Sequence, residues 1–546
     1  MNELAPILSV EDLTVDFLSD GAPARAVDGV SFEVRRGETL VILGESGSGK
    51  SVSTSAVMDL IDRPPGDIVR GRISFDGARI DGLQGEARRV INGRRIAMIF
   101  QDPLAYLNPV YTVGRQICEI FESHGVASGR AARERAMDLL KRVGIPEPEA
   151  RIDQYPHQFS GGQRQRVMIA MAIALQPDLL IADEPTTALD VSVQAQILDL
   201  LRDLQGETGM ALILITHDLE VAASMADRVI VMNRGTIVEA GEARKVFTKP
   251  RHAYTQKLIS ALPHGDAAES SNRRSTTNSG ETVLRVENLT KEYVVSSGLF
   301  GRKKSFLAVK DVSFEVSKGE TLGIVGESGS GKSSVARMLL RLNEPTAGKA
   351  IFNGEDVFAM EERGLRAYRR KVQMVFQDPY GSMNPRMTVR AIIAEPWSIH
   401  ADILPRARWR DRVAELLELV GLKPEHADRY PHQFSGGQRQ RIAIARALAS
   451  EPELVICDEA VSALDVSIQA QIIDLLADLR TRLGLSYIFI THDLPIVRHF
   501  ADRILVMKQG VVVEEGPTST IFGNPSQAYT RSLLDATPVP KWLETA

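Results

Sequence analysis

The sequence contains very little cysteine, with only Cys118 and Cys457 among its 546 residues. Two thiols cannot form a four-cysteine zinc or iron–sulfur site, and so few in a long chain are typical of a reducing compartment. The sequence also lacks an uninterrupted apolar run near the roughly 18 residues that a membrane span needs. Its first residues show no cationic region followed by an apolar core, so no signal peptide is expected. These absences predict a cytosolic chain without spans of its own.

A basic excess is absent as well. Lys and Arg number 65 against 70 Asp and Glu, which gives a formal net charge of -5. A chain without cationic excess is poorly suited to neutralise phosphodiester backbones, so nucleic acid is not an expected partner. The length exceeds what one hydrophobic core supports, and two domains or slightly more are expected.

The sequence does contain an internal repeat. The segment 44–51 (GESGSGKS) reappears at 326–333 with identical letters, and the twelve residues 155–166 return unchanged at 430–441. Glu184 and Glu459 are separated by the same 275 positions as the serines that begin the two Ser-Gly-Gly-Gln motifs, whereas the two GESGSGKS motifs are 282 positions apart. The sequence therefore predicts two duplicated domains that differ by a few residues in a surface segment.

The expected domain boundaries are 1–263 and 283–546, joined by 264–282. The joining segment is rich in Ser, Thr, Asn and charge, a composition that predicts a flexible linker. Each half alternates β-branched apolar runs with longer amphipathic segments, which predicts an α/β sheet with crossover helices. Helical patterns such as 131–143 and 409–420 predict a helical subdomain inserted in each α/β core.

The repeated glycine-rich segment has the form of a phosphate-binding loop. It follows the apolar strand pattern 39–43 and precedes a helix-compatible run, so that backbone N–H groups and a helix N-terminus can face phosphates. Lys50 and Lys332 would reach the β- and γ-phosphates, and Ser51 and Ser333 would ligate Mg²⁺. A plain glycine turn is the alternative, and the duplication argues against it. The predicted loop residues are Gly44, Glu45, Ser46, Gly47, Ser48, Gly49, Lys50 and Ser51, and Gly326, Glu327, Ser328, Gly329, Ser330, Gly331, Lys332 and Ser333.

Two acidic residues follow a short apolar run in each half. Asp183 and Glu184 follow 179–182, and Asp458 and Glu459 have the matching place in the second half. A buried strand that delivers carboxylates at its end suits a nucleotide site. Asp183 and Asp458 would hold the Mg²⁺ shell, while Glu184 and Glu459 would orient and deprotonate the attacking water. Helix-capping turns are the alternative for an isolated acid pair.

Further motifs in the same order resemble those of ATP-binding cassette (ABC) proteins. The signature motif is matched by Ser160, Gly161, Gly162 and Gln163 and by Ser435, Gly436, Gly437 and Gln438. The Q-loop is matched by Gln101 and Gln377, the D-loop by Asp190 and Asp465, and the switch histidine by His217 and His492. The resemblance implies two tandem P-loop NTPase domains, each with an α/β core, an antiparallel β subdomain and a helical subdomain. It also implies ATP as ligand and Gln101 and Gln377 in the Mg²⁺ shell.

The same resemblance implies that the two cassettes pair head to tail and share two ATP molecules. Each signature motif would then complete the nucleotide site that the other cassette begins. Phe17 and Tyr293 hold matching places on an early strand and would stack on adenine, although an aromatic residue in a strand is more often part of the core. Both halves are expected to hydrolyse ATP. The change from Pro185-Thr186 to Ala460-Val461 predicts at most a difference in rate.

The ends of the two cassettes are similar to the C-terminal extension of oligopeptide and dipeptide importer ATPases. The similarity lies in a Pro…Tyr-Thr…Leu pattern at 250–258 and 525–533, with Ala253 and Ala528 where that family usually has proline. It implies uptake of peptides or peptide-like solutes with two membrane permeases and an extracytoplasmic solute-binding protein, at the cytoplasmic face of the inner membrane. Peptide, glutathione, nickel chelate and sugar all remain open as cargo. The alternative is a soluble tandem-cassette ATPase acting on ribosomes or nucleic acid, whose long charged insert or zinc modules this sequence lacks.

Overall fold

The computed structural model describes residues 5–19, 22–187, 189–260, 280–296, 303–462 and 464–537. The chain divides into two compact units, the first built mainly from residues before Pro263 and the second mainly from residues after it. The expected linker falls at 264–282. Its residues 264–279 lie outside the described part of the chain, and Thr282 begins strand β11 (Thr282–Ser296).

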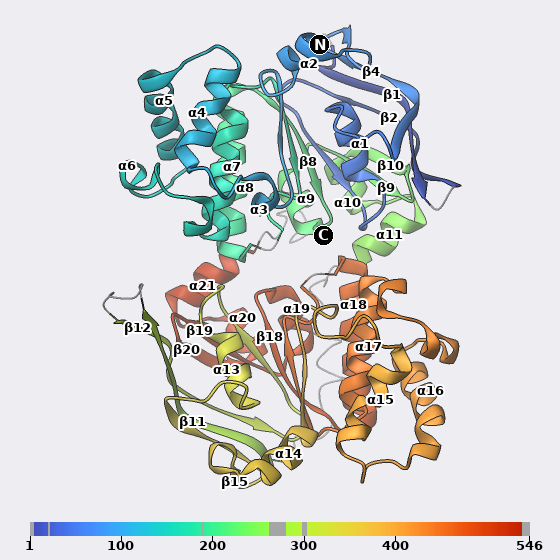
Figure 1. The fold of residues 1–546 in the computed structure, drawn as a ribbon, viewed down its shortest axis with the longest axis vertical. Helices are drawn as coiled ribbons and strands as arrows, with labels where there is room; N and C mark the ends of the chain where they lie inside the picture. The colour runs from blue at the N-terminus through green and yellow to red at the C-terminus, as the bar shows by residue number, and fades with distance from the viewer. Residues whose placement is uncertain are drawn as a thin grey trace. The chain divides into compact units, whose positions relative to one another are not determined.

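The first unit contains a four-stranded antiparallel sheet and a six-stranded sheet (Figure 1). The strand orders are β2-β1-β4-β5 and β10-β9-β3-β8-β7-β6. Neighbours in the larger sheet are parallel except β9 and β10. The strands are β1 (Leu8–Ser19), β2 (Ala22–Val34), β3 (Thr39–Leu43), β4 (Gly66–Phe75), β5 (Ala78–Arg79), β6 (Ile96–Ile99), β7 (Leu179–Asp183), β8 (Ala211–Thr216), β9 (Arg228–Asn233) and β10 (Thr236–Glu242).

The helices of the first unit fall into a group near the core sheet and a separate helical group. Helices α4, α5 and α7 contact one another and form the separate group (Figure 1). The helices are α1 (Lys50–Val57), α2 (Gly85–Ile91), α3 (Pro103–Tyr106), α4 (Val113–Ser123), α5 (Gly129–Arg142), α6 (Pro148–Arg151), α7 (Gly161–Ile173), α8 (Val191–Thr208), α9 (Leu219–Met225), α10 (Ala243–Thr248) and α11 (Ala253–Ser260). Val113, Ile117 and Phe121 of α4 are buried at a spacing of four residues, which places one apolar face against the neighbouring helices.

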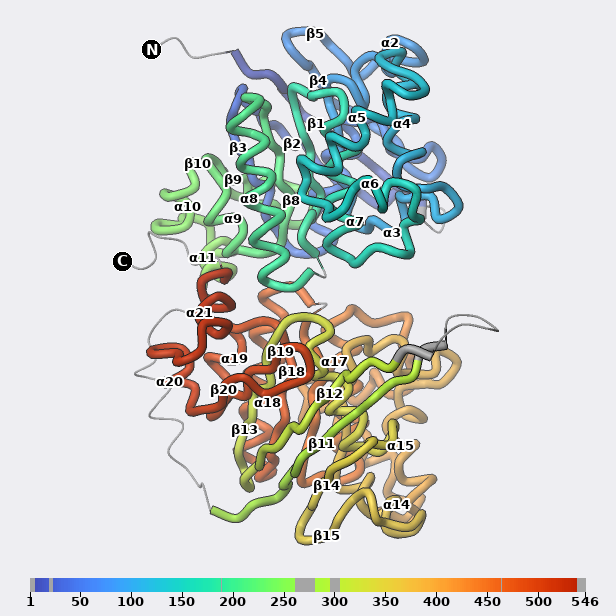
Figure 2. The backbone as a smooth tube through the Cα atoms, turned by 90° about the vertical axis from the view of Figure 1, so that its left-hand side faces the viewer, coloured from blue at the N-terminus to red at the C-terminus, as the bar shows by residue number. Residues whose placement is uncertain are grey.

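The second unit repeats both sheets, with the orders β12-β11-β14-β15 and β16-β17-β18-β13-β19-β20. In Figure 2 its antiparallel strands β11, β12 and β14 run alongside one another. Besides β11, the strands are β12 (Lys303–Ser317), β13 (Thr321–Val325), β14 (Ala347–Phe352), β15 (Glu355–Asp356), β16 (Val372–Val375), β17 (Leu454–Asp458), β18 (Ser486–Thr491), β19 (Arg503–Lys508) and β20 (Val511–Pro517). The helices are α13 (Lys332–Leu339), α14 (Glu362–Lys371), α15 (Val389–Ile399), α16 (Trp409–Leu419), α17 (Gly436–Leu448), α18 (Val466–Leu483), α19 (Leu494–Phe500), α20 (Thr518–Gly523) and α21 (Ala528–Asp535).

The core sheets are covered on both faces, which explains their continuous apolar strands. In the first unit, Leu40 and Ile42 of β3 pack in one cluster with Leu13 and Phe75 of the antiparallel sheet. In the second unit, Ile456 of β17 packs with the antiparallel sheet, as its cluster includes Leu284 and Phe352. Its neighbour Cys457 faces the other way and packs with Trp397 of α15 and Ile442 of α17.

The α/β core and the helical segments expected in each half are present in the structure. The strand pattern 39–43 is β3, and the helical patterns 131–143 and 409–420 are α5 and α16 within a residue or two at each end. Each unit also has the antiparallel sheet that the family resemblance implied. None of the helices in the described part of the chain has the length and apolar character that a membrane crossing requires.

Candidate functional site

The predicted site residues of the first unit follow the carboxyl ends of neighbouring parallel strands. Strands β6, β7, β8 and β3 lie side by side in this order, so their carboxyl ends meet at one edge of the sheet. Gln101 follows β6, Glu184 follows β7, His217 follows β8, and the glycine-rich loop follows β3. The topology thus gathers residues that are up to 173 positions apart in the sequence, from Gly44 to His217.

The glycine-rich loop of the first unit folds around its own lysine. The Lys50 ammonium is buried and donates hydrogen bonds to the carbonyl oxygens of Gly44 and Glu45, at 2.7 and 3.0 Å. Gly49 has φ 98°, and a Cβ there would lie 2.7 Å from the carbonyl oxygen of Ala26, so the position accepts only glycine. The Ser48 hydroxyl is buried without a hydrogen-bond partner among the described residues. A cationic cradle with an unsatisfied hydroxyl fits a polyphosphate.

A serine hydroxyl and an aspartate meet beside this loop. Ser51 Oγ donates to Asp183 Oδ1 at 3.0 Å. Burial raises the pKa of Asp183 to about 6, and the hydrogen bond from Ser51 only partly opposes this effect. A hydroxyl and a buried carboxylate are hard oxygen ligands of the kind that Mg²⁺ prefers, so these two residues fit the expected metal.

Three side chains surround the carboxylate of Glu184. Gln101 Nε2 donates to Glu184 Oε2 at 2.8 Å, Thr187 Oγ1 donates to the same oxygen at 3.0 Å, and His217 Nδ1 lies 3.1 Å from Oε1. Burial raises the pKa of Glu184, but the hydrogen bond and charge of His217 outweigh it, so the pKa is lowered overall. The carboxylate is therefore ionised at neutral pH and can accept a proton.

The second unit contains the same arrangement. Lys332 Nζ donates to the carbonyl oxygens of Gly326 and Glu327 at 2.6 and 2.8 Å, and Ser333 Oγ donates to Asp458 Oδ1 at 2.9 Å. Burial lowers the pKa of the lysine and raises that of Asp458.

The catalytic glutamate proposed for the second unit has a smaller set of partners. Gln377 Nε2 donates to Glu459 Oε2 at 2.7 Å, and His492 Nδ1 lies 3.5 Å from Oε1. The hydrogen bond with His492 lowers the pKa of Glu459 against the effect of burial. The hydroxyl of Ser462, which matches Thr187, donates to the backbone oxygen of Glu459 at 3.0 Å and not to its carboxylate. The two sites therefore differ in how their glutamates are held.

Each Ser-Gly-Gly-Gln motif forms the N-terminus of a helix in its own unit. The Ser160 hydroxyl accepts from Gln163 N at 3.3 Å, while Gln163 Oε1 accepts from Ser160 N at 3.1 Å. Ser435 and Gln438 form the same reciprocal pair at 3.4 and 3.1 Å. This capping box leaves an exposed helix N-terminus, where partial positive charge favours an anion.

Four predicted residues remain, the two D-loop aspartates and the two aromatic residues. Asp465 stands at the position directly before α18, and Asp190 directly before α8. Phe17 is half-buried beside Gly66, with its Cε1 atom 2.9 Å from where a Cβ of that glycine would lie. The hydroxyl of Tyr293 accepts from Asn343 Nδ2 at 3.1 Å, and Lys291 Nζ lies 5.0 Å from its ring centre. The stacking role of both rings stays a prediction.

Sequence reasoning missed two groups of residues near the site. Thr187 was not singled out, although it stands three residues after Glu184, where a turn brings its hydroxyl back to the carboxylate. Tyr254 and Tyr529 belong to the C-terminal pattern, and this pattern does not predict that both hydroxyls contact a glycine-rich loop. Their occurrence at matching places in both halves was the signal available in the sequence.

Comparison with known protein families decides the identity of the fold. The family described as "ABC transporter" matches residues 27–187 and 309–462, more than half of the chain. The chain belongs to the ABC transporter family. A second family, described as "Oligopeptide/dipeptide transporter, C-terminal region", matches residues 238–287 and 513–545. The resemblance of both cassette ends to that extension is therefore confirmed.

Individual relatives align along nearly the whole chain. The "Peptidoglycan transport ATP-binding protein YejF" of Agrobacterium fabrum is 48% identical over 532 residues, which cover 97% of this chain and 96% of that protein. The "Glutathione import ATP-binding protein GsiA" of Shigella boydii is 47% identical over 559 residues, which cover 98% of this chain and 90% of that protein. A dimeric ATP-binding cassette solved with ADP and Pi matches 43% of this chain and 98% of its own, with 31% identity and a TM-score of 0.39.

These findings establish the general activity of this ABC transporter family member. It is an ATPase with two cassettes in one polypeptide, as the tandem P-loop architecture predicted. Both relatives are named as transport or import proteins, and neither name supports the alternative of a ribosome- or nucleic-acid-directed ATPase. The roles assigned to single site residues stay predictions.

Proposed function

We propose that this chain is the ATP-hydrolysing subunit of an importer for peptides or peptide-like solutes. The observation that carries the proposal is the same set of side chains beside the glycine-rich loop in both units. In each unit a glutamate lies within hydrogen-bond reach of a glutamine and close to a histidine, beside a lysine-filled phosphate loop. The match of both cassette ends to the oligopeptide/dipeptide transporter extension supports the solute class.

The loop residues bind and orient the triphosphate in this proposal. Lys50 and Lys332 exchange their loop-carbonyl partners for phosphate oxygens, and the backbone N–H groups of the loop and the helix N-terminus add to the anion site. Ser51 and Asp183, and likewise Ser333 and Asp458, would hold Mg²⁺, with Gln101 and Gln377 completing its shell. When bound, Mg²⁺ neutralises charge that develops on the phosphoryl oxygens.

The glutamates and histidines handle the attacking water. Glu184 and Glu459 are ionised and accept the proton of the water that attacks the γ-phosphate. His217 and His492 orient these carboxylates and carry donors toward the developing phosphate charge. Gln101 and Gln377, which precede the helical subdomains, link the state of each glutamate to these subdomains.

Pairing of the two cassettes is a further part of the proposal. Each exposed Ser-Gly-Gly-Gln helix N-terminus offers donors for a nucleotide held by the other cassette, as the family resemblance implies. We propose two permeases as membrane partners, an extracytoplasmic solute-binding protein, and a peripheral location at the cytoplasmic face of the inner membrane. The relatives named for peptidoglycan transport and glutathione import support a peptide-like cargo.

Glutamate-to-glutamine substitutions test the hydrolytic proposal. Glu184→Gln and Glu459→Gln should each lower ATPase activity strongly, and the double variant should retain Mg-ATP binding but not hydrolysis, because the amide cannot accept the proton. Glu207→Gln, on the exposed face of α8, is the matched control and should hydrolyse ATP at the wild-type rate. Normal hydrolysis by the double variant would contradict the general-base assignment.

A fractionation experiment tests the transport proposal. The chain should sediment with membranes when its permeases are co-expressed and stay in the supernatant without them. Co-sedimentation with ribosomes in the absence of permeases would contradict the importer assignment.

A further inference from the structure

The tyrosine of each C-terminal extension reaches the phosphate loop of its own unit. Tyr254 lies in α11 and Tyr529 in α21. The hydroxyl oxygen of Tyr254 accepts a hydrogen bond from the backbone N–H of Glu45 at 3.3 Å, and that of Tyr529 accepts one from Glu327 at 3.3 Å. Two separate segments of the chain thus make the same contact with the second residue of a phosphate loop.

That loop residue is held from two sides. The carbonyl oxygen of Glu45 accepts from Lys50 Nζ at 3.0 Å, while its N–H is bound by the tyrosine. In the second unit, the carbonyl oxygen of Glu327 accepts from Lys332 Nζ at 2.8 Å. The backbone segment that positions each phosphate-binding lysine is therefore the segment that the tyrosine fixes.

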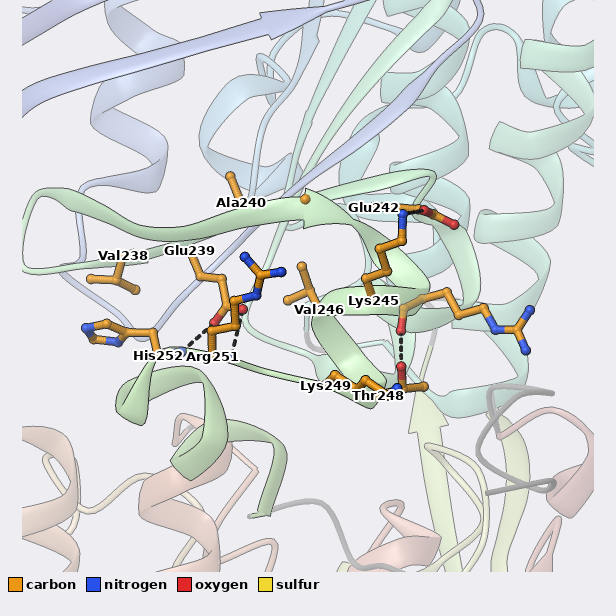
Figure 3. Close-up of a pocket in the computed structure, with 12 residues that line it drawn as sticks. Val238, Glu239, Ala240, Glu242, Lys245, Val246, Thr248, Lys249, Arg251 and His252 are labelled. Carbon is orange, nitrogen blue, oxygen red and sulfur yellow. Dashed lines mark hydrogen bonds and ion pairs between the residues drawn. The ribbon is translucent and has the colours of Figure 1, made fainter.

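The extension that carries the tyrosine is anchored to the core sheet. Glu239 of β10 accepts hydrogen bonds from the backbone N–H groups of Arg251 and His252 at 2.9 and 3.1 Å, directly before α11 (Figure 3). Glu514 of β20 binds the N–H groups of Ser526 and Gln527 at 2.7 and 3.2 Å before α21. A carboxylate at a helix N-terminus is favourable, so each tyrosine projects from a fixed element.

The ring of the second tyrosine lies close to a lysine of the core sheet. Lys508 Nζ lies 4.4 Å from the centre of the Tyr529 ring, and the matching residue of β9 is Asn233, which carries no charge. Burial raises the pKa of Tyr529 to about 12, so its hydroxyl stays neutral at physiological pH. A neutral hydroxyl adds no negative charge beside a site for a polyphosphate.

We propose that Tyr254 and Tyr529 are positioning residues for the two ATP sites. Each hydroxyl fixes the second residue of a phosphate loop, so that the C-terminal extension sets how well the loop binds ATP. This inference rests on the proposed nucleotide sites and assigns the extension a role in them. Loss of the tyrosine hydroxyl from each site predicts an effect of about three- to tenfold on ATP affinity.

Phenylalanine substitutions in the full chain test this inference. The variant Tyr254→Phe with Tyr529→Phe keeps both rings and removes only the hydroxyls. We expect its KM for ATP to rise about three- to tenfold, with kcat changed by less than about twofold, and the ATP-induced thermal shift to be smaller. Tyr368→Phe is the control, because it removes a buried hydroxyl that donates to Leu339 O at 2.6 Å and does not contact a loop. It should lower Tm without changing KM.

A second variant tests the role of the extension itself. Glu239→Gln with Glu514→Gln weakens the anchors and keeps the tyrosines, so KM for ATP should rise in the same direction by a smaller factor. Unchanged KM and thermal shift in the double phenylalanine variant would overturn the inference while leaving the ATPase assignment intact. A wild-type chain that neither binds nor hydrolyses ATP would overturn both.

Discussion

The two glutamates that we propose as catalytic differ in one hydrogen bond from a nearby hydroxyl group. Thr187 and Ser462 occupy matching positions three residues after their glutamates. The threonine hydroxyl donates to the carboxylate of Glu184, whereas the serine hydroxyl donates to the backbone oxygen of Glu459. The first carboxylate thereby gains a partner that the second lacks.

This difference predicts unequal effects of removing the two hydroxyls. Thr187→Val keeps the shape of the side chain and removes its hydroxyl. In a Glu459→Gln background this change should lower the remaining ATPase rate about two- to fivefold. The effect is modest because Thr187 is exposed, so that water can take the place of its hydroxyl. In a Glu184→Gln background, Ser462→Ala should change the rate by less than about twofold. Steady-state phosphate release measures both. Equal losses in the two backgrounds would show that the hydroxyls do not distinguish the sites.

Most residues that the structure gathers at this sheet edge could be singled out in the sequence, because the expected chemistry demands a residue type at a fixed spacing. Lys50 must follow its glycines, and Asp183 and Glu184 must follow a buried strand, so the sequence alone identifies them. The partners of a hydroxyl could not be predicted in this way. Thr187 and Ser462 look equivalent in sequence, and only the structure shows that their hydroxyls donate to different kinds of oxygen.

At the scale of elements, helix α7 approaches α8 closely at a glycine of the signature motif. A Cβ on Gly162 would overlap Val193 Cγ1. Gly162→Ala should therefore destabilise the first unit, because overpacking costs about 1–3 kcal/mol, while helix propensity at the second residue of α7 returns at most about 1 kcal/mol. Gly161→Ala is the control, since its Cβ would lie 3.6 Å from Leu189 Cδ2, an ordinary contact.

A second substitution should make Gly162→Ala stabilising instead of destabilising. In a Val193→Ala background the overlap is absent, and Gly162→Ala should then stabilise the unit through helix propensity alone. Urea unfolding of the wild type, the two single variants and the double variant measures the coupling free energy between positions 162 and 193. Additive effects would mean that the two side chains do not meet.

The two cysteines lie in different elements and differ in burial. Cys457 is fully buried in β17, and burial raises the pKa of its thiol to about 12; Cys118 in α4 is only partly buried. Burial also raises the pKa of the Cys118 thiol, but this side chain stays partly exposed, so between pH 7 and 9 Cys118 should react with an aromatic disulfide reagent while the fully buried Cys457 should not. Cys457 should react only when the second unit unfolds. Absorbance measures the thiols released, and Cys118→Ser assigns them. Two thiols that react at similar rates in the folded chain would contradict this placement.

The strands and helices were predictable to different degrees. The strand at 39–43 is continuous and apolar because both faces of β3 are covered, and such a run has sharp ends in the sequence. The pairing of β1 with both β2 and β4 could not be read from a pattern, because it depends on contacts between residues far apart in the chain. The antiparallel sheets could be expected only from the family resemblance.

At the scale of the whole molecule, most of the architecture could be predicted from the internal duplication. Two copies of every motif predicted two units of the same fold, which the matching strand orders of the two core sheets confirm. The role of the C-terminal extensions could not be predicted from their sequence. The contact of Tyr254 with Glu45 joins residues 209 positions apart, and no local pattern encodes it.

The joining of two cassettes in one polypeptide predicts how activity responds to dilution. If the cassettes of one chain pair with each other, covalent connection makes their encounter intramolecular, at an effective concentration far above that of the protein in an assay. ATPase activity per chain should then stay constant from micromolar to low-nanomolar protein. A chain cut at a protease site introduced within 264–279 should match the intact chain at high concentration and lose activity on dilution, because its halves separate. The intact chain with the same site left uncut is the control. A fall in activity of the uncut chain on dilution would instead show that the active pair forms between two chains.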